Sequence, residues 1–453
     1  MIDTSTPNSP GWWLNRLIKL LGEKRDGYQR LDDYYRNLNG IPVHASRAVG
    51  ESYRRLMAMS STNFAELAVE ATRERMQPLG FRTGADPDEL GDREAWRIWQ
   101  ANSLDADHTI VDRGTLTMGT SYMIVGPVDD EIGAPLITPE DPREVIAVCD
   151  PARRRRVLAA LKVFHDDIES CDRAYLYLPG YVIRARRATP ENSTTITMNA
   201  DGFVWDGEPQ KLPALVVPVV PFRNRDPANP SGEFEPHLTV LDRINYTILS
   251  RLEAMTMQAY RQRGIKGLPL HDADGEEIDY SGDFLDGPGE LWQLPETAEI
   301  WESGLIDLTP ILESVKADVR DFASVTRTPM TYFFPDAAQG SAEGAALMRE
   351  GLVFKVKDRM TQQGESYEQV MSLAFLFAGD AARASRTDME IIWAPPERYT
   401  LGERGSAASQ AAASGMPWQG IARHIWQMSP QEVARLEADR QAEALLSEPA
   451  DVA

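Results

Sequence analysis

HLTVLDRINYTILSRLEAMTMQAYRQR, residues 237–263, is the stretch that decides the fold of this chain. Its apolar residues recur three or four positions apart, which is the period of one face of an α-helix. At 1.5 Å per residue, such a helix is roughly 40 Å long. A helix with an apolar stripe of this length needs other elements to cover it. The stripe consists of Leu238, Leu241, Ile244, Ile248, Leu252, Met255 and Ala259.

Two further helices are expected downstream. One begins at Thr309-Pro310, where a proline fits the first turn, and ends before Pro329, because a residue that precedes proline disfavours the helical conformation. The other has Ser341 as its N-cap, and Gly364 is the position at which it can kink. The chain beyond Ile391 is expected to be helical again. The centre of the protein is therefore a helix, an insert, a second helix, a loop and a third long helix.

The region upstream of residue 237 changes character along its length. Residues 14–21 place apolar side chains at i, i+3, i+4 and i+7, which predicts a helix, and further helices are expected over Asn63–Gln77 and from Asp92. From about 120 to 223, short β-rich runs alternate with turn residues, which indicates an antiparallel β module. The prolines in LVVPVVPF make the last run an edge strand or a connector. The runs are Ser121–Val128, Val145–Cys149, Val157–Phe164, Tyr175–Leu178, Tyr181–Ala185, Thr194–Met198 and Leu215–Phe222.

The charge balance limits the classes of function. The 453 residues include 69 acidic and 47 basic ones, for a net charge of −22. A regulator that grips nucleic acid is usually basic, because phosphate neutralisation supplies most of its affinity. A tube through which DNA slides without sticking is compatible with this charge. The sequence also lacks a signal peptide pattern and any apolar run near the roughly 20 residues that a membrane span needs.

The usual motifs of catalysis and metal binding are missing from the sequence. It has no phosphate-binding GxxxxGK[ST], no GxSxG and no HxH or HExxH pair. Cys149 and Cys171 form no CxxC pair, so we expect neither a zinc ribbon nor a disulfide framework. The stretch 272–276 hints at a calcium loop, but Glu277 occupies the position where an EF-hand needs glycine. The run Arg153–Arg156 is either a charged turn between strands or a contact for phosphate. We therefore expect no catalytic residue, cofactor or metal.

The order of these elements resembles the portal proteins of long-tailed bacteriophages, a head-to-tail connector family whose members have a wing, a stem, a clip and a crown. The resemblance covers about residues 12 to 445, and it lies in the order and spacing of several segments rather than in one motif. The segment 403–417 departs from the pattern, because it lacks the acidic residue expected near the start of the crown. The segments that carry the resemblance are LDDYYRNLNG (31–40), GTSYMIVGP (119–127), ITPEDPREVIAVCDP (137–151), VVPVVPFRNR (216–225), LTVLDRINYTILSRLEA (238–254, with Asp242 and Asn245), SVTRTPMTYFFPD (324–336) and GSAEGAAL (340–347).

The resemblance implies an α+β fold that is mainly α, with a helical and β wing, a two-helix stem, a small clip insert, a long wing helix and a helical crown. The implied divisions are the N-terminal section of the wing over 1–236, the first stem helix 237–263, the clip 264–307, the second stem helix 308–327, the tunnel loop 328–340, the long wing helix and return 341–398, and the crown with the C-terminal tail 399–453.

It also implies a function. Portal proteins of this kind form homo-dodecameric rings at one vertex of the capsid, in contact with the major capsid protein. Double-stranded DNA passes through the ring with weak contacts during packaging and ejection. The terminase large subunit supplies the ATPase, and a head–tail connector or adaptor docks on the ring. The protein is thus expected in the host cytoplasm during assembly and in the virion afterwards, away from membranes, and it is not an enzyme.

The implied site residues fall into three groups, each with an ordinary alternative. The tunnel-loop residues face the DNA channel, or their aromatic members pack between subunits or in the wing. The stem cations face the channel, or they form a solvated helix face or ion pairs between subunits. The clip acids dock partners, or they serve solubility only. The tunnel-loop group is Met330, Thr331, Tyr332, Phe333, Phe334, Asp336 and Gln339; the stem group is Lys316, Arg320 and Arg327; the clip group is Asp272, Asp274, Glu276 and Glu277.

Two other functions compete with this interpretation. The first is a different structural phage protein, such as a minor head protein, although the helix–insert–helix centre speaks against it. The second is a metal-dependent enzyme that processes nucleic acid. Such an enzyme needs clustered carboxylates in a cleft, whereas the acidic residues here gather in a turn-rich insert without a supporting histidine or lysine.

Overall fold

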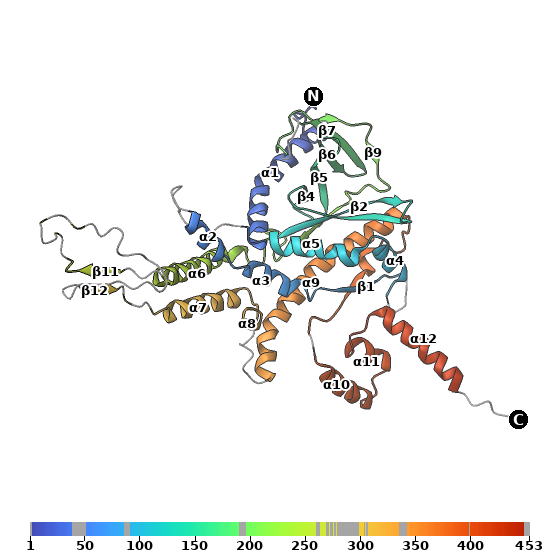
Figure 1. The fold of residues 1–453 in the computed structure, drawn as a ribbon. Helices are drawn as coiled ribbons and strands as arrows, with labels where there is room; N and C mark the ends of the chain where they lie inside the picture. The colour runs from blue at the N-terminus through green and yellow to red at the C-terminus, as the bar shows by residue number, and fades with distance from the viewer. Residues whose placement is uncertain are drawn as a thin grey trace. The chain divides into compact units, whose positions relative to one another are not determined.

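The structure, a computed structural model, divides into two compact units (Figure 1). The larger unit comprises Met1–Asn39, Asn63–Leu241 and Asp321–Ala453, and the smaller one comprises Gly40–Thr62 and Asp242–Arg320. The fold is α+β and mainly α, as the sequence predicts. The structure describes residues 2–38, 51–85, 91–189, 196–259, 263–268, 299–302, 307–334, 342–397 and 399–447, and the single residues 271, 275, 278 and 304.

A three-stranded antiparallel sheet lies at the centre of the larger unit. Its middle strand is β2 (Thr120–Asp129), and its edges are β3 (Ala134–Glu140) and β10 (Val219–Arg223). The prediction of an edge strand for the proline-containing run is confirmed, because β10 pairs only with β2 in the described sheet. Pro221 can sit there because an edge strand leaves one row of backbone groups outside the ladder.

A second antiparallel sheet of the larger unit has six strands and is covered by a long helix. Its path is β4-β5-β6-β7-β8, and β9 also pairs with β7. Helix α1 (Pro10–Tyr35) begins at the N-cap Ser9 and buries an apolar face against this sheet. A smaller apolar cluster joins the two sheets through side chains such as Tyr122, Val157 and Val219. The strands are β4 (Val145–Cys149), β5 (Val157–Asp166), β6 (Cys171–Leu178), β7 (Tyr181–Ala188), β8 (Val204–Trp205) and β9 (Gln210–Lys211).

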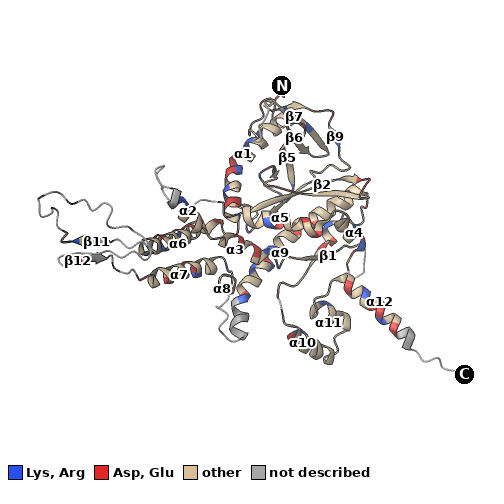
Figure 2. Ribbon diagram, in the orientation of Figure 1, with Lys and Arg blue, Asp and Glu red and all other residues tan. Residues whose placement is uncertain are grey.

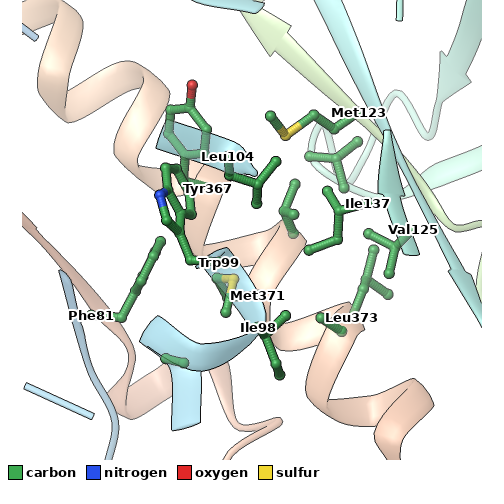
Figure 3. Close-up of a cluster of buried hydrophobic side chains, with 14 of the residues drawn as sticks. Phe81, Ile98, Trp99, Leu104, Met123, Val125, Ile137, Tyr367, Met371 and Leu373 are labelled. Carbon is green, nitrogen blue, oxygen red and sulfur yellow. The ribbon is translucent and has the colours of Figure 1, made fainter. Parts of the chain in front are cut away.

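The main core of the larger unit lies between the three-stranded sheet and several helices. Helices α4 (Arg93–Ala101), α5 (Leu104–Met118) and α9 (Ala342–Ala378) contribute to it, and α3 (Phe64–Arg73) contacts α5. Figure 3 shows Trp99 of this core between Tyr367 and Phe81. The ring centroid of Trp99 lies 5.7 Å from that of Tyr367 and 5.6 Å from that of Phe81. Aromatic pairs at these separations favour offset-stacked or edge-to-face geometry, which restricts how the rings can pack.

Two glycines allow close backbone contacts in this core. Gly119 ends α5 with a φ of +79°, and a Cβ there would lie 2.8 Å from the backbone of Ser231. Gly364, the position predicted to allow a kink, lies within α9, which is helical on both sides of it. A Cβ on Gly364 would meet Ile391 at 3.0 Å and Trp393 at 3.4 Å. Gly364 thus lets strand β13 (Glu390–Trp393) lie against the helix.

The strand β13 of the larger unit pairs with a strand that lies far from it in the sequence. It pairs antiparallel with β1 (Pro78–Arg82), so residues near the start and near the end of the chain share a ladder. The 3₁₀ turn η3 (Arg386–Asp388) precedes it. Three helices follow: α10 (Leu401–Ala413) with a capping box at Thr400, α11 (Trp418–His424) and α12 (Pro430–Ser447). The prediction of a helical tail is confirmed apart from β13.

The smaller unit consists of helices and a short ladder. Its elements are α2 (Glu51–Met59), most of α6 (Leu238–Ala259), the paired strands β11 (Arg263–Lys266) and β12 (Glu299–Glu302), and most of α7 (Thr309–Val325). Asn245 of α6 is buried and accepts hydrogen bonds from the backbone nitrogen and the hydroxyl of Thr62, at 3.1 and 2.8 Å. Asp318 of α7 is 3.2 Å from the hydroxyl of Thr247, so it links the two long helices.

Several sequence-based boundaries need correction. Helix α6 spans Leu238–Ala259 and residues 260–262 lie outside the described residues, whereas Arg263, expected in the helix, and Gly264 lie in β11. Residues 196–198 of the expected strand Thr194–Met198 form no strand, because Ile196 and Met198 pack onto the core under α1 instead. The expected run 215–222 is a strand only from Val219 onward. The elements that the sequence did not predict are helices α2, α5 and α8 and strands β1, β3, β8, β9, β11, β12 and β13.

Candidate functional site

A buried ion cluster lies in the larger unit, just before the chain enters α6 through the 3₁₀ turn η1 (Glu235–His237). Glu233 has no solvent exposure, and its Oε1 accepts from Nε of Arg359 at 2.6 Å. Its Oε2 lies 3.9 Å from Nζ of Lys355 and 3.5 Å from Nη2 of Arg225. We call Glu233, Arg225, Lys355 and Arg359 the Glu233 cluster. Lys355 and Arg359 come from the same face of α9, one turn apart.

Hydrogen bonds connect the Glu233 cluster to the neighbouring elements. Nζ of Lys355 donates to the carbonyl of Thr326 at 2.8 Å, directly after the last turn of α7. Carbonyls at a helix C-terminus lack partners within the helix, and a lysine can satisfy one of them. The backbone nitrogen of Glu233 donates to the carbonyl of Leu116 in α5 at 2.7 Å. The cluster thus ties the end of α7, the approach to α6 and the middle of α9 together.

The electrostatics of the cluster follow from burial and charge together. Burial alone raises the pKa of Glu233, but the charges of Lys355 and Arg359 outweigh it and lower that pKa to about 2. Burial lowers the pKa of Lys355 to about 8, although the carboxylate of Glu233 opposes this shift. Glu233 is therefore ionised throughout the neutral range. Its negative charge is what makes two nearly buried cations tolerable in this core.

The described residues of the expected tunnel loop lie beside the end of α7. Residues 330–333 form the short helix α8 (Met330–Phe333). Phe333 is buried, and its ring lies 5.3 Å from that of Phe64 in α3 and 6.0 Å from that of Phe322 in α7. The hydroxyl of Tyr332 accepts from Nη2 of Arg75 at 3.2 Å. Both aromatic side chains thus hold α8 against the larger unit.

The remaining members of this group differ in exposure. Thr331 is exposed, whereas Met330 and Phe334 are partly buried. Asp336 and Gln339 lie outside the described residues. Over the stretch that the structure describes, the tunnel-loop group is therefore a packed helical turn.

The expected stem cations are exposed. Lys316 and Arg320 lie one turn apart on α7, and Nζ of Lys316 is 3.0 Å from the carboxylate of Glu313. Arg327 follows α7 with a left-handed φ of +52°. The expected clip residues Asp272, Asp274, Glu276 and Glu277 lie outside the described residues.

A second buried carboxylate lies in the main core. Asp112 of α5 has no solvent exposure, and its Oδ1 accepts from the hydroxyl of Tyr367 at 2.7 Å. Its Oδ2 has no hydrogen-bond partner among the described residues. Burial raises the pKa of Asp112 to about 7, although the Tyr367 hydroxyl opposes the rise. This side chain is therefore poised to gain or lose a proton near neutral pH.

The described residues contain neither a metal-binding cluster nor a membrane-spanning helix. No three His, Cys, Asp or Glu side chains come together there in a way that would hold a metal ion. Within the same ranges, no helix combines the length and the apolar character that crossing a lipid bilayer demands.

The Glu233 cluster was not predictable from local sequence patterns. Glu233 and Arg359 are 126 positions apart, so no local spacing brings them together. One signal was available: Lys355 and Arg359 flank the apolar stripe of a helix that also carries Leu352, Val356 and Met360, which are buried. Basic residues beside a buried stripe need a carboxylate partner when they are themselves buried.

Comparison with known proteins gives a consistent result. The family model described as phage portal protein, SPP1 Gp6-like, matches residues 15–444. The portal protein of Mycobacterium phage D29 is 28% identical over 387 residues, which cover 80% of this chain and 74% of that protein. The portal protein of Mycobacterium phage L5 is 27% identical over 415 residues, which cover 86% and 78%. A chain from the virion of a native gene transfer agent particle is 12% identical, with a TM-score of 0.45, and the match covers 87% of this chain and 97% of that one.

Proposed function

Since this chain belongs to the SPP1 Gp6-like family of phage portal proteins, we propose that it is the subunit of a dodecameric ring at one vertex of a phage head. The ring forms the channel through which double-stranded DNA is packaged and ejected. The major capsid protein surrounds it, and the terminase large subunit and a head–tail connector dock on it in turn. The protein assembles in the host cytoplasm and stays in the virion. Its role is structural, and no catalytic step is assigned to it.

The observation that carries this proposal is the family match over residues 15–444. The folded chain supports it with an outgoing helix, α6, the β11–β12 ladder and a returning helix, α7. Both helices display large apolar side chains to solvent, among them Tyr246, Met255 and Leu312. Exposed apolar side chains spread along helices are typical of surfaces that another copy covers.

The three groups of site residues have separate roles in this ring. Lys316, Arg320 and Arg327 face the channel and make weak, repeated contacts with DNA. The tunnel loop projects its polar residues, with Asp336 and Gln339, toward the axis, while Tyr332 and Phe333 hold its base. Asp272, Asp274, Glu276 and Glu277 belong to the clip, where basic surfaces of the partners dock. Long-range attraction of this kind raises association rates and weakens with salt.

Native mass spectrometry and negative-stain imaging of the purified full chain test the ring. We expect a closed particle with a central hole and a mass near twelve times 50.5 kDa. The measurement is made at several salt concentrations, because exposed apolar surfaces associate more strongly as salt rises whereas ion pairs weaken. A chain that remains a monomer or dimer at high protein concentration under all these conditions contradicts the proposal.

A further inference from the structure

A basic pocket of the larger unit includes none of the residues assigned above. It has a volume of about 400 Å³ and lies between α1, the end of β4, the turn after it and the end of β10. A second hollow of about 150 Å³ shares Arg154, Arg223 and Pro227 with it. The charged side chains that line the larger pocket are Lys24, Arg154, Arg223 and Asp150.

The charges of this pocket are unusual for an acidic chain. Acidic and basic residues are interspersed along helices such as α1 and α12 (Figure 2). With 69 acidic residues against 47 basic ones, a lysine or arginine has many possible partners. Nevertheless Lys24, Arg154 and Arg223 form no ion pair with any carboxylate in the described portion of the chain. The one acidic lining residue, Asp150, instead accepts from the backbone nitrogen of Ala152 at 2.9 Å.

Neutral groups hold the central guanidinium of the pocket in place. Nη2 of Arg223 lies 2.9 Å from Sγ of Cys149, and its Nη1 donates to the carbonyls of Pro227 at 3.2 Å and Arg154 at 3.5 Å. These contacts fix the position of Arg223 without cancelling its charge. Burial and then the charge of Arg223 lower the pKa of Lys24, so the two cations affect each other. A preorganised, uncompensated guanidinium with a second unpaired cation beside it favours the binding of an anion.

The surroundings of the pocket indicate an extended anion. The exposed run Arg153–Arg156 continues from its rim, and only Arg155 of this run forms a described ion pair, at 3.6 Å from Glu365. A single carboxylate would contact only one or two of these cations, whereas successive phosphate groups of a backbone could each contact a different one. Planar guanidinium groups bind phosphate oxygens through two parallel hydrogen bonds.

We propose that this pocket, with Lys24, Arg154 and Arg223, binds phosphate groups of a double-stranded DNA backbone, and that the run Arg153–Arg156 extends the contact along the strand. The inference rests on the proposed function, because that function brings DNA to the protein. It assigns the DNA a place outside α6 and α7. The net charge of −22 keeps the contact weak and confines it to this basic surface.

Titration of the full chain, in the assembly it forms, with a short fluorescein-labelled DNA duplex tests the site. The test variant is Lys24→Gln/Arg154→Gln, since neither side chain forms a hydrogen bond or ion pair within the described ranges and the fold should not depend on them. The matched control is Arg186→Gln/Lys211→Gln. It removes the same charge from exposed positions on β7 and β9 of the same unit.

We expect the pocket variant to bind the duplex about tenfold more weakly at low salt, with a salt dependence of log K that is shallower by about 0.9 for each lost contact. The control should bind like the wild type. Equal losses in both variants would show that only total charge matters, and that result overturns the proposal. Unchanged binding by the pocket variant, or no binding by the wild type at low salt, also overturns it.

Native mass spectrometry of the same samples separates the remaining outcomes. If the pocket variant fails to assemble while the control assembles, the pocket holds a carboxylate of a second copy and the proposal is wrong. If the wild type itself forms no ring, the proposed function fails. The duplex titration still decides on the pocket in that case, because it compares variants in whatever assembly forms.

Discussion

Two carboxylates of the larger unit are equally buried, but their pKa values are shifted in opposite directions. Glu233 and Asp112 both have 0% exposure. Glu233 lies among three basic side chains, and its pKa is lowered to about 2. Asp112 has a tyrosine hydroxyl as its hydrogen-bond partner, and its pKa is raised to about 7. Burial alone therefore does not decide the protonation state of a core carboxylate; its partners decide it.

A buried carboxylate can thus be part of a charged cluster, like Glu233, or an isolated ionisable group, like Asp112. The Glu233 cluster is a set of charges in which every member depends on the others, so the loss of one leaves an uncompensated buried charge. Asp112 is a single group that remains neutral at low pH and costs stability when it ionises. Substitutions at the two positions should accordingly have opposite signs at neutral pH.

The largest effect is expected for Glu233→Gln. This change leaves Lys355 and Arg359 buried without a carboxylate, and it should lower the free energy of unfolding by about 3–5 kcal/mol at pH 7. Denaturation by guanidinium, followed by tryptophan fluorescence, measures the loss. Because the folded pKa of Glu233 lies below its usual 4.5, its contribution is complete above pH 4.5 and disappears as the pH falls toward 2. The difference between variant and wild type should shrink over that window.

A surface pair provides the control for this experiment. Glu94 lies 2.6 Å from Arg97 on the exposed side of α4, and Glu94→Gln should cost less than about 1 kcal/mol. If Glu233→Gln proves equally mild, the cations of the cluster are not coupled to Glu233. If the variant does not fold, adding Lys355→Met should recover some of the stability, since it removes one uncompensated charge.

Asp112→Asn should stabilise the protein at neutral and higher pH. The folded pKa of Asp112, about 7, lies above its usual 3.8, so the stability that the neutral carboxyl provides is complete below pH 3.8 and is lost as the pH rises through 7. The variant should match the wild type near pH 4 and exceed it at pH 8. Each pKa unit corresponds to about 1.4 kcal/mol, so the gain amounts to a few kcal/mol.

Thermal and chemical unfolding at pH 4 and pH 8 check this prediction. Asp439→Asn, at an exposed position of α12, serves as the control and should stay within about 0.5 kcal/mol at both pH values. A variant less stable than the wild type at pH 8 would mean that ionised Asp112 has a partner that stabilises its charge.

The smallest effect is expected for Tyr367→Phe. It removes the 2.7 Å hydrogen bond to Asp112 and should cost about 1 kcal/mol at pH 5. The cost should be larger at pH 8, because the hydroxyl then donates to an ionised carboxylate, and such hydrogen bonds are stronger. Urea denaturation of Tyr367→Phe and of Tyr399→Phe, at a residue that is 55% exposed, gives the comparison. A cost that falls between pH 5 and pH 8 would contradict the assignment.

The long helices were predictable because their apolar residues repeat over many turns. Helices α1, α7 and α9 lie where the spacing of Leu, Ile and Val predicts them. Helix α5 was missed for a physical reason: its buried face carries the polar residues His108, Asp112 and Thr115, at positions i, i+4 and i+7. Polar residues at these positions interrupt the apolar stripe by which a buried helix face is recognised in a sequence.

The candidate site was less predictable than the fold. The resemblance to portal proteins supplied the groups around Lys316 and Phe333, and the structure places the first on an exposed helix face and the second in a packed turn. Neither the spacing nor the resemblance indicated the Glu233 cluster or the basic pocket. Both combine side chains from segments far apart in the sequence, and only the folded chain brings them together.

The pairing of β1 with β13 has a consequence for synthesis on the ribosome. Arg82 pairs with Glu390, so β1 has no partner strand while some three hundred further residues are translated. At about 5–20 residues per second, this wait lasts roughly 15–60 s. During that time β1 is a nascent edge strand, the kind of segment that associates with other chains when it is left unpaired. When many copies are translated at once, β1 can therefore pair with other nascent chains until β13 of its own chain has been synthesised.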